Sequence, residues 1–407
     1  MEFGVGSSLA KVCDYCRTTI VRSDKGLENL GKVAELAKVP SLIAVGDTGT
    51  LAGYPFTVMG QLQLDYGKGV WEEYYLSYGG GQAWGWLAYD DGIWYASSLQ
   101  PWFEPPPYGS LQLEQDVQLD GHGVFRVAES RSGSVVTAKG ELPFPVKPGE
   151  VFYYTDLRGP SGTYATIDYG DNSDADEVDI FTGRIFYEHE LAVDPGAPSH
   201  AVRAQTGAIK CQSCGGELQL VSGARAWRVG CSYCGAMNDL TGQGVVAQQQ
   251  AYSKPQIPIG THAVFGGVEY IVIAYLVRSE KEDGERYSWE EYLLWSEKIG
   301  YRWLEKDEGN WTWSMSISVA DLDLSGMPKV VGFNGKKFKK TEKSKARVDY
   351  VLGEVYWECT VGEKEHSTDF EARGGEKLSR EATEGEVQWS YATPVAWPVI
   401  QQGLRSP

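Results

Sequence analysis

Short stretches in which hydrophobic and polar residues alternate dominate this chain, and they predict a mainly β protein. Tyr74 with Leu76, and Tyr292 with Leu294, show the period of two that places successive side chains on opposite faces of a strand. Turn residues separate these stretches. The clearest turn is Asn334-Gly335, because both residues tolerate the positive φ of a type I′ hairpin.

A helical periodicity stands out in one segment near the N-terminus. Ser23-Asp24-Lys25 precedes apolar residues spaced three and four apart, and Pro40 ends the pattern. We therefore expect a short amphipathic helix over residues 23–40, packed against the neighbouring β domain. Its apolar positions are Leu27, Leu30, Val33, Ala34, Leu36 and Ala37.

The chain repeats itself, and the repeat decides the predicted architecture. At one constant offset, Gly46, Gly53, Phe56 and Val58 recur as Gly260, Gly267, Tyr270 and Val272. After a short insertion, Trp71-Glu72-Glu73-Tyr74 recurs letter for letter as Trp289-Glu290-Glu291-Tyr292. Further along, residues 148–152 align with 352–356, and Asp168-Tyr169 aligns more loosely with Asp369-Phe370.

These patterns predict a mainly β fold built from tandem copies of a small barrel or sandwich domain. A zinc ribbon is inserted between the copies, and one short helix precedes them. The expected order is a partial ribbon (1–22), the helix (23–40), the first β domain (42–198), a complete ribbon (205–240), a linker (241–256) and the second β domain (257–400).

Composition and charge narrow the functional classes. Aromatic residues make up 12% of the 407 residues and there are 49 glycines, which suits a β-rich protein with many turns. A net charge of −18 disfavours nucleic acid as a partner. The sequence shows neither a secretory signal nor a transmembrane stretch, so we expect a cytoplasmic protein and leave peripheral membrane association open.

Two Cys-x-x-Cys-Gly knuckles predict a structural zinc site. Zinc takes four thiolates in a tetrahedron, and Cys211, Cys214, Cys231 and Cys234 supply them from two tight turns. Because cysteine fills all four positions, the site has no open position for catalysis. Leu218, Leu220 and Trp227 are expected to form the ribbon's core. A redox dithiol pair, or iron in the same cage, are the alternatives.

A third pair, Cys13 and Cys16, stands alone near the N-terminus. Cys13-Asp-Tyr-Cys16 matches the second knuckle of the complete ribbon, Cys231-Ser-Tyr-Cys234. We expect a partner knuckle upstream of Met1. The alternative is an incomplete metal site that other ligands complete, so a second zinc depends on ligands outside this pair. Cys359 lies in a strand-like run and is expected to be a small buried hydrophobic residue rather than a third ligand.

The repeated Trp-Glu-Glu-Tyr segments are the candidate ligand or partner surfaces. Trp71, Glu72, Glu73 and Tyr74, with Trp289, Glu290, Glu291 and Tyr292, could bind a small cation through ion pairs and cation–π contacts. The structural interpretation, which we favour, is cross-strand packing of the aromatic rings with the glutamates facing solvent.

Other charged runs and catalytic signatures add little. Residues 329–347 hold eight basic residues and one acid, which we interpret as a solvated hairpin rather than a phosphate-binding one. Residues 168–179 are acidic but lack the spacing of a calcium loop. The sequence has no phosphate-binding loop, nucleophile elbow or dinucleotide fingerprint, and no histidine recurs in both copies. An enzyme is therefore the weaker interpretation.

Several further segments stand beside the two Trp-Glu-Glu-Tyr repeats: Gly26-Leu-Glu-Asn-Leu-Gly-Lys-Val-Ala-Glu-Leu, Val45-Gly46 and Trp86-Leu87. Together these segments resemble an uncharacterised bacterial family, the domain of unknown function numbered 4178. The resemblance implies zinc-ribbon knuckles followed by tandem β domains, with no established activity. Genes of such proteins tend to lie beside those of membrane proteins and polyamine-synthesis enzymes, which hints at envelope stress.

The function expected from the sequence is a zinc-ribbon interaction, scaffold or ligand-binding protein with a protein partner. The first alternative is an enzyme or polyamine sensor that uses the repeated Trp-Glu-Glu-Tyr surfaces. Nucleic-acid binding through the ribbon and the basic hairpin is the disfavoured alternative, because the chain is strongly acidic.

Overall fold

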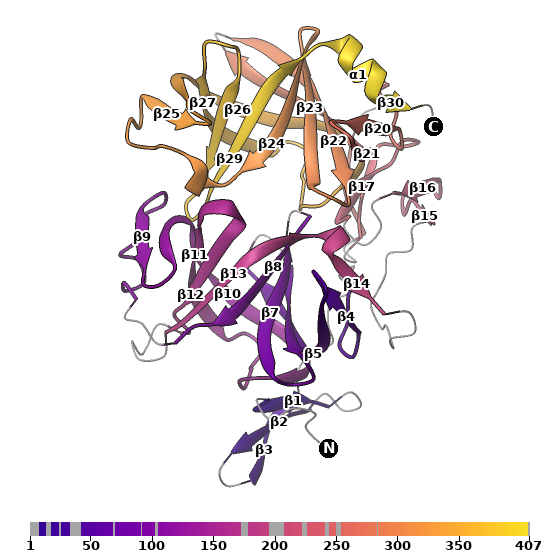
Figure 1. Ribbon diagram of the computed structural model, residues 1–407. Coiled ribbons are helices and arrows are strands. Elements are labelled where there is room, and N and C mark those ends of the chain that lie inside the picture. The colour runs from indigo at the N-terminus through magenta and orange to yellow at the C-terminus, as the bar shows by residue number, and fades with distance from the viewer. Residues whose placement is uncertain are drawn as a thin grey trace. The chain divides into compact units, whose positions relative to one another are not determined.

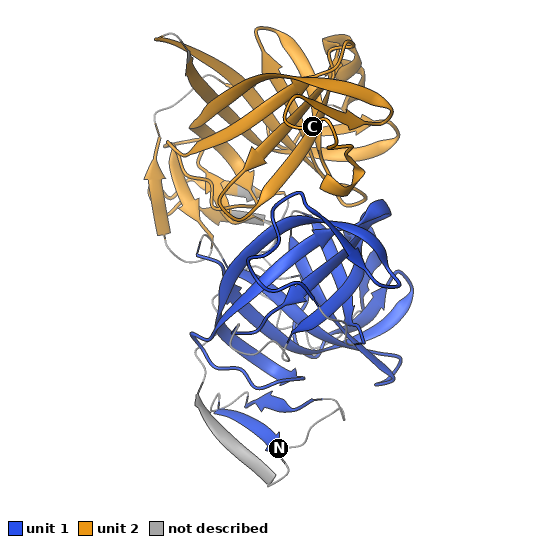
Figure 2. Cartoon of the chain, turned by 90° about the vertical axis from the view of Figure 1, so that its left-hand side faces the viewer, with its two compact units in different colours: residues 1–202 blue, residues 203–407 orange. Residues whose placement is uncertain are grey.

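The computed structural model describes residues 8–13, 18–23, 26–32, 42–67, 70–90, 92–101, 105–171, 178–194, 207–221, 226–240, 244–249, 254–282 and 284–405 (Figure 1). The chain divides into two compact units, residues 1–202 and 203–407 (Figure 2). Strands dominate both units. Among the described residues, no helix is long and apolar enough to cross a membrane.

The N-terminal unit is built around a closed ring of antiparallel strands, here called the N-terminal barrel. The ring runs β5-β6-β7-β8-β13-β12-β11-β10 and closes because β10 also pairs with β5. Its strands are β5 (Tyr54–Asp65), β6 (Val70–Tyr78), β7 (Ala83–Asp90), β8 (Ile93–Leu99), β10 (Gly123–Leu142), β11 (Val151–Arg158), β12 (Thr163–Asp168) and β13 (Asp179–Tyr187). Around it lie β1 (Ala10–Val12), β2 (Thr18–Ser23), β3 (Gly26–Lys32), β4 (Thr48–Leu51), β9 (Asp116–Leu119) and β14 (Leu191–Val193).

The C-terminal unit repeats this plan as an eight-stranded barrel, the C-terminal barrel. The order is β21-β22-β23-β24-β29-β28-β27-β26, closed by pairing of β26 with β21. Its strands are β21 (Val268–Glu282), β22 (Glu285–Ser296), β23 (Gly300–Asp307), β24 (Asn310–Ile317), β26 (Lys336–Val355), β27 (Lys364–Glu371), β28 (Lys377–Ala382) and β29 (Val387–Val395). The remaining elements are β15 (Gly207–Lys210), β16 (Glu217–Leu220), β17 (Arg228–Gly230), β18 (Ala236–Asp239), β19 (Gly244–Gln248), β20 (His262–Phe265), β25 (Val330–Phe333), α1 (Trp397–Gly403) and β30 (Leu404–Arg405).

The predicted duplication is confirmed at the level of single hydrogen bonds. The Gly46 amide donates to the Val58 carbonyl over 2.9 Å, and the Gly260 amide donates to the Val272 carbonyl over 2.7 Å. The predicted hairpin at Asn334-Gly335 is also confirmed, with φ values of 47° and 71°. The mainly β fold class and the two repeated domains are therefore correct.

Two parts of the sequence alignment between the copies are wrong. Gly149-Glu150 corresponds to Gly362-Glu363, because each segment closes the same backbone loop. The Gly149 amide bonds Val135 and the Gly362 amide bonds Val348, both over 2.7 Å. Likewise Asp369 lies on β27, the counterpart of β11, so that it corresponds to Asp156 and not to Asp168. Loops of different length between the strands shift the offset and hid this match.

The helix expected over residues 23–40 is also wrong. Residues 26–32 form β3, which pairs with β2, while residues 33–40 lie outside the described residues. Pairing with β2 supplies hydrogen-bond partners that a helix would otherwise supply, so tertiary context overrides a short apolar periodicity. Among the described residues, the α-helix is α1 (Trp397–Gly403), close to the C-terminal end of the chain.

One end of each barrel interior is packed with apolar side chains, and a knuckle hairpin contributes to it. In the N-terminal barrel, Val12 on β1 packs with Leu62 and Leu142. In the C-terminal barrel, Met237 on β18 packs with Leu276 and Val351 and is fully buried. The hairpins therefore belong to the barrel cores, although they lie far from the barrel strands in sequence.

Gly140 and Gly353 allow β10 and β26 to approach the strand beside them. They have φ values of 75° and 82°, and an added Cβ would lie 2.3 Å from the Met59 carbonyl oxygen and 2.2 Å from that of Ile273. We expect Gly353→Ala to destabilise the C-terminal barrel by roughly 3 kcal/mol or more, since backbone atoms must move. Chemical denaturation measures this loss.

Gly335→Ala is the matched control. Gly335 also has a positive φ, but no atom lies within 4 Å of its added Cβ, so the cost is limited to about 1–2 kcal/mol of left-handed strain. Equal losses in the two variants would contradict the close-approach explanation.

Candidate metal centre and barrel interiors

The four cysteines predicted to bind zinc lie together in the C-terminal unit. Their ligand atoms all lie within 4.8 Å of one another. The Sγ atoms of Cys211 and Cys234 are 3.7 Å apart, and those of Cys214 and Cys231 are 3.9 Å apart. A tetrahedron with Zn–S bonds of about 2.3 Å has edges of about 3.8 Å. The cysteines could therefore hold a metal ion, and the spacing is consistent with zinc.

Matching backbone turns present the two pairs of sulfurs. Gly215 and Gly235 have φ values of 73° and 71°, as expected for the glycine after each second cysteine. The Gly216 and Tyr233 amides each point to a thiol sulfur over 3.4 Å. Such N–H groups stabilise thiolates.

The first cysteines of the two knuckles, Cys211 and Cys231, differ in the pKa of their thiols. Burial opposes ionisation of Cys211, but the Cys214 and Ser213 amides outweigh it and lower the pKa of Cys211 to about 6. Burial raises the pKa of Cys231. A cation bound among the four sulfurs would favour ionisation of the Cys231 thiol.

The ribbon has a small core of its own. Leu218 and Leu220 are 4% and 5% exposed and pack beside Cys211 and Cys231, as the sequence predicted. Trp227, the third residue predicted for this core, is half-buried and lies outside the cluster, in which Ala226 and Val229 participate instead.

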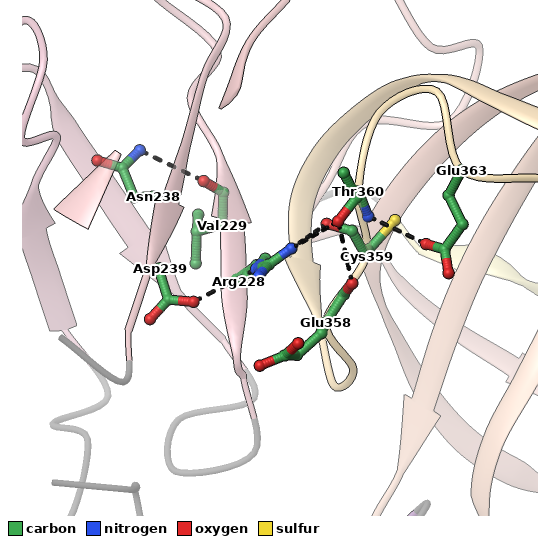
Figure 3. A network of polar contacts seen from close by, with 8 residues as sticks. All are labelled: Arg228, Val229, Asn238, Asp239, Glu358, Cys359, Thr360 and Glu363. Atoms are coloured by element: carbon green, nitrogen blue, oxygen red, sulfur yellow. Dashed lines mark hydrogen bonds and ion pairs between the residues drawn. The ribbon is translucent and has the colours of Figure 1, made fainter. Parts of the chain in front are cut away.

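A buried arginine fastens the ribbon to the C-terminal barrel, at what we call the ribbon–barrel junction (Figure 3). Arg228 donates through Nε to Asp239 over 3.3 Å. Its Nη1 donates to the Cys359 carbonyl over 2.8 Å and to the Thr360 hydroxyl over 3.0 Å. Both charged side chains are over nine-tenths buried. The ion pair and its hydrogen bonds therefore take the place of the hydrogen bonds that each group would form with water.

Further contacts continue this junction. Strand β17 pairs with β26, with Gly230 opposite Gly353. The Gln249 amide group donates to the Val351 carbonyl and accepts from the Val351 amide, both over 2.7 Å. Asn238 accepts from the Gln212 amide in the first knuckle over 2.8 Å, which links both knuckles to the barrel sheet.

Cys13 of the lone N-terminal pair occupies the position that Cys231 has in the second knuckle. Strand β1 pairs with β10 as β17 pairs with β26. The Cys13 amide donates to Thr18 over 3.0 Å, and the Cys231 amide donates to Ala236 over 2.9 Å. Cys13 is half-buried, whereas Cys16 lies outside the described residues. Cys359 is fully buried in the core of the C-terminal barrel, as expected.

The repeated Trp-Glu-Glu-Tyr segments form the same hydrogen bonds in both copies. Trp71 donates to Glu73 over 3.1 Å, and Trp289 donates to Glu291 over 2.7 Å. On the other face of the strand, Tyr74 bonds Glu72, and Tyr292 bonds Glu290 over 2.9 Å. The eight residues thus do not form one surface. Tyr74 and Tyr292 are buried packing residues, and Glu72 is buried as well, contrary to the solvent-facing glutamates of the structural interpretation.

Trp71 and Glu73 point into the N-terminal barrel. The Trp71 ring lies 6.1 Å from that of Tyr154 on β11, which is not a neighbour of β6 in the sheet. Burial raises the pKa of Glu73 to about 7. The hydrogen bond from Trp71 lowers this pKa, and the charges of Asp168 and Asp156 raise it. Asp156 accepts from the Thr166 hydroxyl over 2.6 Å. The interior therefore gathers carboxyl groups beside aromatic rings.

The C-terminal barrel places carboxyl groups at corresponding positions. Glu291 accepts from Arg278 over 2.7 Å, and Arg278 also bonds Glu365. Asp369 accepts from the Ser379 hydroxyl over 2.7 Å, as Asp156 does from Thr166. Glu381 lies opposite Ser367 as Asp168 lies opposite Tyr154.

Both interiors thus share three acidic positions, of which the sequence identified one as a candidate. These are Glu73/Glu291, Asp156/Asp369 and Asp168/Glu381. A sequence signal for the second position exists: Gly149-Glu150 recurs as Gly362-Glu363, and Glu150 and Glu363 each lie six residues before the acid, Asp156 or Asp369. The third carries different acids in the two copies, so the repeat of identical residues did not reveal it.

One family model matches the chain twice, over residues 44–186 and 258–396, and its description is a domain of unknown function (DUF4178). The comparisons with curated proteins and with solved structures found no match. The matched regions cover most of each closed sheet and leave out the four-cysteine site between them. Because they account for more than half of the sequence, the chain belongs to the DUF4178 family and carries its domain twice.

Proposed function

We propose that this protein binds small organic cations in its two barrels, and that one structural zinc in the four-cysteine site holds the ribbon on the C-terminal barrel. The observation that carries the proposal is the repeated interior acid set, Glu73/Glu291, Asp156/Asp369 and Asp168/Glu381. Carboxylates beside aromatic rings suit amines, which gain ion pairs and cation–π contacts together.

Solvent access supports the proposal for the N-terminal barrel. Glu73, Asp156 and Asp168 are half-buried, so that a ligand from solution can reach them. Desolvation raises the pKa of Glu73 to about 7 and that of Asp168 to about 6. A bound amine would offset the cost of holding these groups ionised.

Titration calorimetry with spermidine tests the proposal. We expect binding to the native protein and a loss of about tenfold or more in affinity for Glu73→Gln with Glu291→Gln, which removes one charge per barrel without changing side-chain size. Glu297→Gln is the control, because Glu297 is exposed outside the barrel interiors. Absence of binding at millimolar spermidine, or equal loss in the control, would refute the cation site.

The affinity for spermidine should rise as pH increases from about 6 to 8. Below pH 7 the Glu73 carboxyl is protonated and offers no charge, and above it the carboxylate attracts the amine. The same raised pKa also makes the stability of the protein depend on pH. Because the folded pKa of Glu73 exceeds the unfolded value, its contribution to stability falls as pH rises from about 4.5 to 7.

Glu73→Gln should flatten both pH profiles, which calorimetry and thermal unfolding across this range measure. Unchanged profiles in the variant would show that another group titrates.

A further inference from the structure

The outward side of β26, β27 and β28 carries a cluster of cations that we call the cationic face. Alternate residues of these strands, such as Ser367 and Asp369, point into the barrel, where they hydrogen-bond each other over 3.2 Å. The residues between them therefore point outward. The face consists of Lys343, Lys345, Arg347, Lys364, His366 and Arg380.

The strand register places basic side chains directly opposite one another. Arg347 lies opposite Lys364, and Lys345 lies opposite His366. The like charges of Arg347 and Lys364 repel each other. Asp349 relieves this at one point, where it accepts from Arg347 over 3.2 Å. Lys343, Lys345 and Lys364 remain exposed. An anionic partner would relieve the remaining repulsion.

The fold itself does not require these charges. In the N-terminal barrel the same positions are Ser130, Ser132 and Ser134 on β10, and their partners on β11 are Thr155, Tyr153 and Val151. The same backbone thus forms with neutral side chains, so the cations are a property of the C-terminal copy alone.

In the N-terminal barrel, part of this face is covered by a segment of the chain itself. Tyr108 packs on Tyr153 with ring centroids 4.8 Å apart and on Tyr169 at 5.3 Å. The Tyr169 hydroxyl donates to the Pro106 carbonyl over 3.0 Å, which holds the segment in place. In the C-terminal barrel the position of Tyr153 belongs to His366, which is exposed.

We propose that the cationic face is a docking surface for an acidic polypeptide segment. The covered face of the N-terminal barrel shows that this sheet surface accepts a polypeptide, and the charge selects an acidic one. Strands β26–β28 expose no large hydrophobic side chain. They therefore offer neither a stacking platform for single-stranded nucleic acid nor an apolar wedge for a membrane.

Fluorescence anisotropy with a labelled Glu-Gly repeat peptide tests this proposal on the full chain. We expect binding that weakens with salt, and a loss of about tenfold in the variant K343S/K345S/R347S, which adopts the serines of the N-terminal barrel. The single variant K345S should show a smaller loss, and circular dichroism should show native secondary structure in both.

The control variant K281S/K298S/R405S removes the same charge from exposed sites outside the face and should bind within about twofold of the native protein. The proposal is overturned if the control loses as much affinity as the face variant, or if no peptide binds at low salt. Tighter binding of duplex DNA or of phosphatidylglycerol vesicles through the same residues would assign the face to another class of partner and would equally overturn it.

Discussion

Replacing Cys231 by serine should remove the metal from the four-cysteine site and destabilise the C-terminal unit by roughly 5 kcal/mol or more, because metal binding supplies the folding free energy of small ribbons. The loss should spread into the barrel, since β17 and Met237 join the knuckles to the sheet and its core. Elemental analysis should find about one zinc per native chain and none in Cys231→Ser.

A chelator separates loss of metal from damage to packing. It should lower the unfolding midpoint of the native protein towards that of Cys231→Ser and should leave the variant's midpoint unchanged. Cys359→Ser is the control, because Cys359 is equally buried but lies in the barrel core, and it should keep its zinc. Native protein without bound metal would refute the zinc assignment. Two metal ions per chain would show that Cys13 takes part in a second site.

Replacing Arg228 by methionine should destabilise the C-terminal unit by about 3–5 kcal/mol, because the change removes the guanidinium that pairs with the buried Asp239 carboxylate. The Cys359 carbonyl and the Thr360 hydroxyl also lose their donor at the ribbon–barrel junction. Chemical denaturation monitored by tryptophan fluorescence measures the loss, and metal content should stay near that of the native protein.

An exposed ion pair provides the control for Arg228. Arg286 bonds Asp349 over 2.6 Å, but its side chain is 48% exposed, so Arg286→Met should cost under about 1 kcal/mol. The double variant Arg228→Met/Asp239→Leu should recover part of the loss, since it removes the buried carboxylate together with the guanidinium. If Arg228→Met costs no more than Arg286→Met, the junction does not depend on this ion pair.

The predicted helix over residues 23–40 and the predicted solvent-facing glutamates are wrong for related physical reasons. A periodicity indicates which side of an element is apolar. Residues 26–32 form a strand because their backbone pairs with β2, and a local pattern does not show this pairing. The sequence shows the repeat of Trp-Glu-Glu-Tyr, but successive residues of one strand point to opposite faces. Glu73 therefore enters the barrel interior while Glu72 bonds Tyr74 and Gln61 on the other face.

The sequence by itself determined the local features of this protein. Cys-x-x-Cys-Gly spacing indicates a metal knuckle because two thiols and a positive-φ glycine define one tight turn, and repeated motifs reveal a duplication wherever they occur. Only the tertiary structure decided which distant residues meet. Closure of each sheet brings Glu73 to Asp156 and Asp168, and strand register gathers Lys345, Arg347 and Lys364 on one face. Such contacts depend on loop lengths and pairing partners, which no local pattern of residues records.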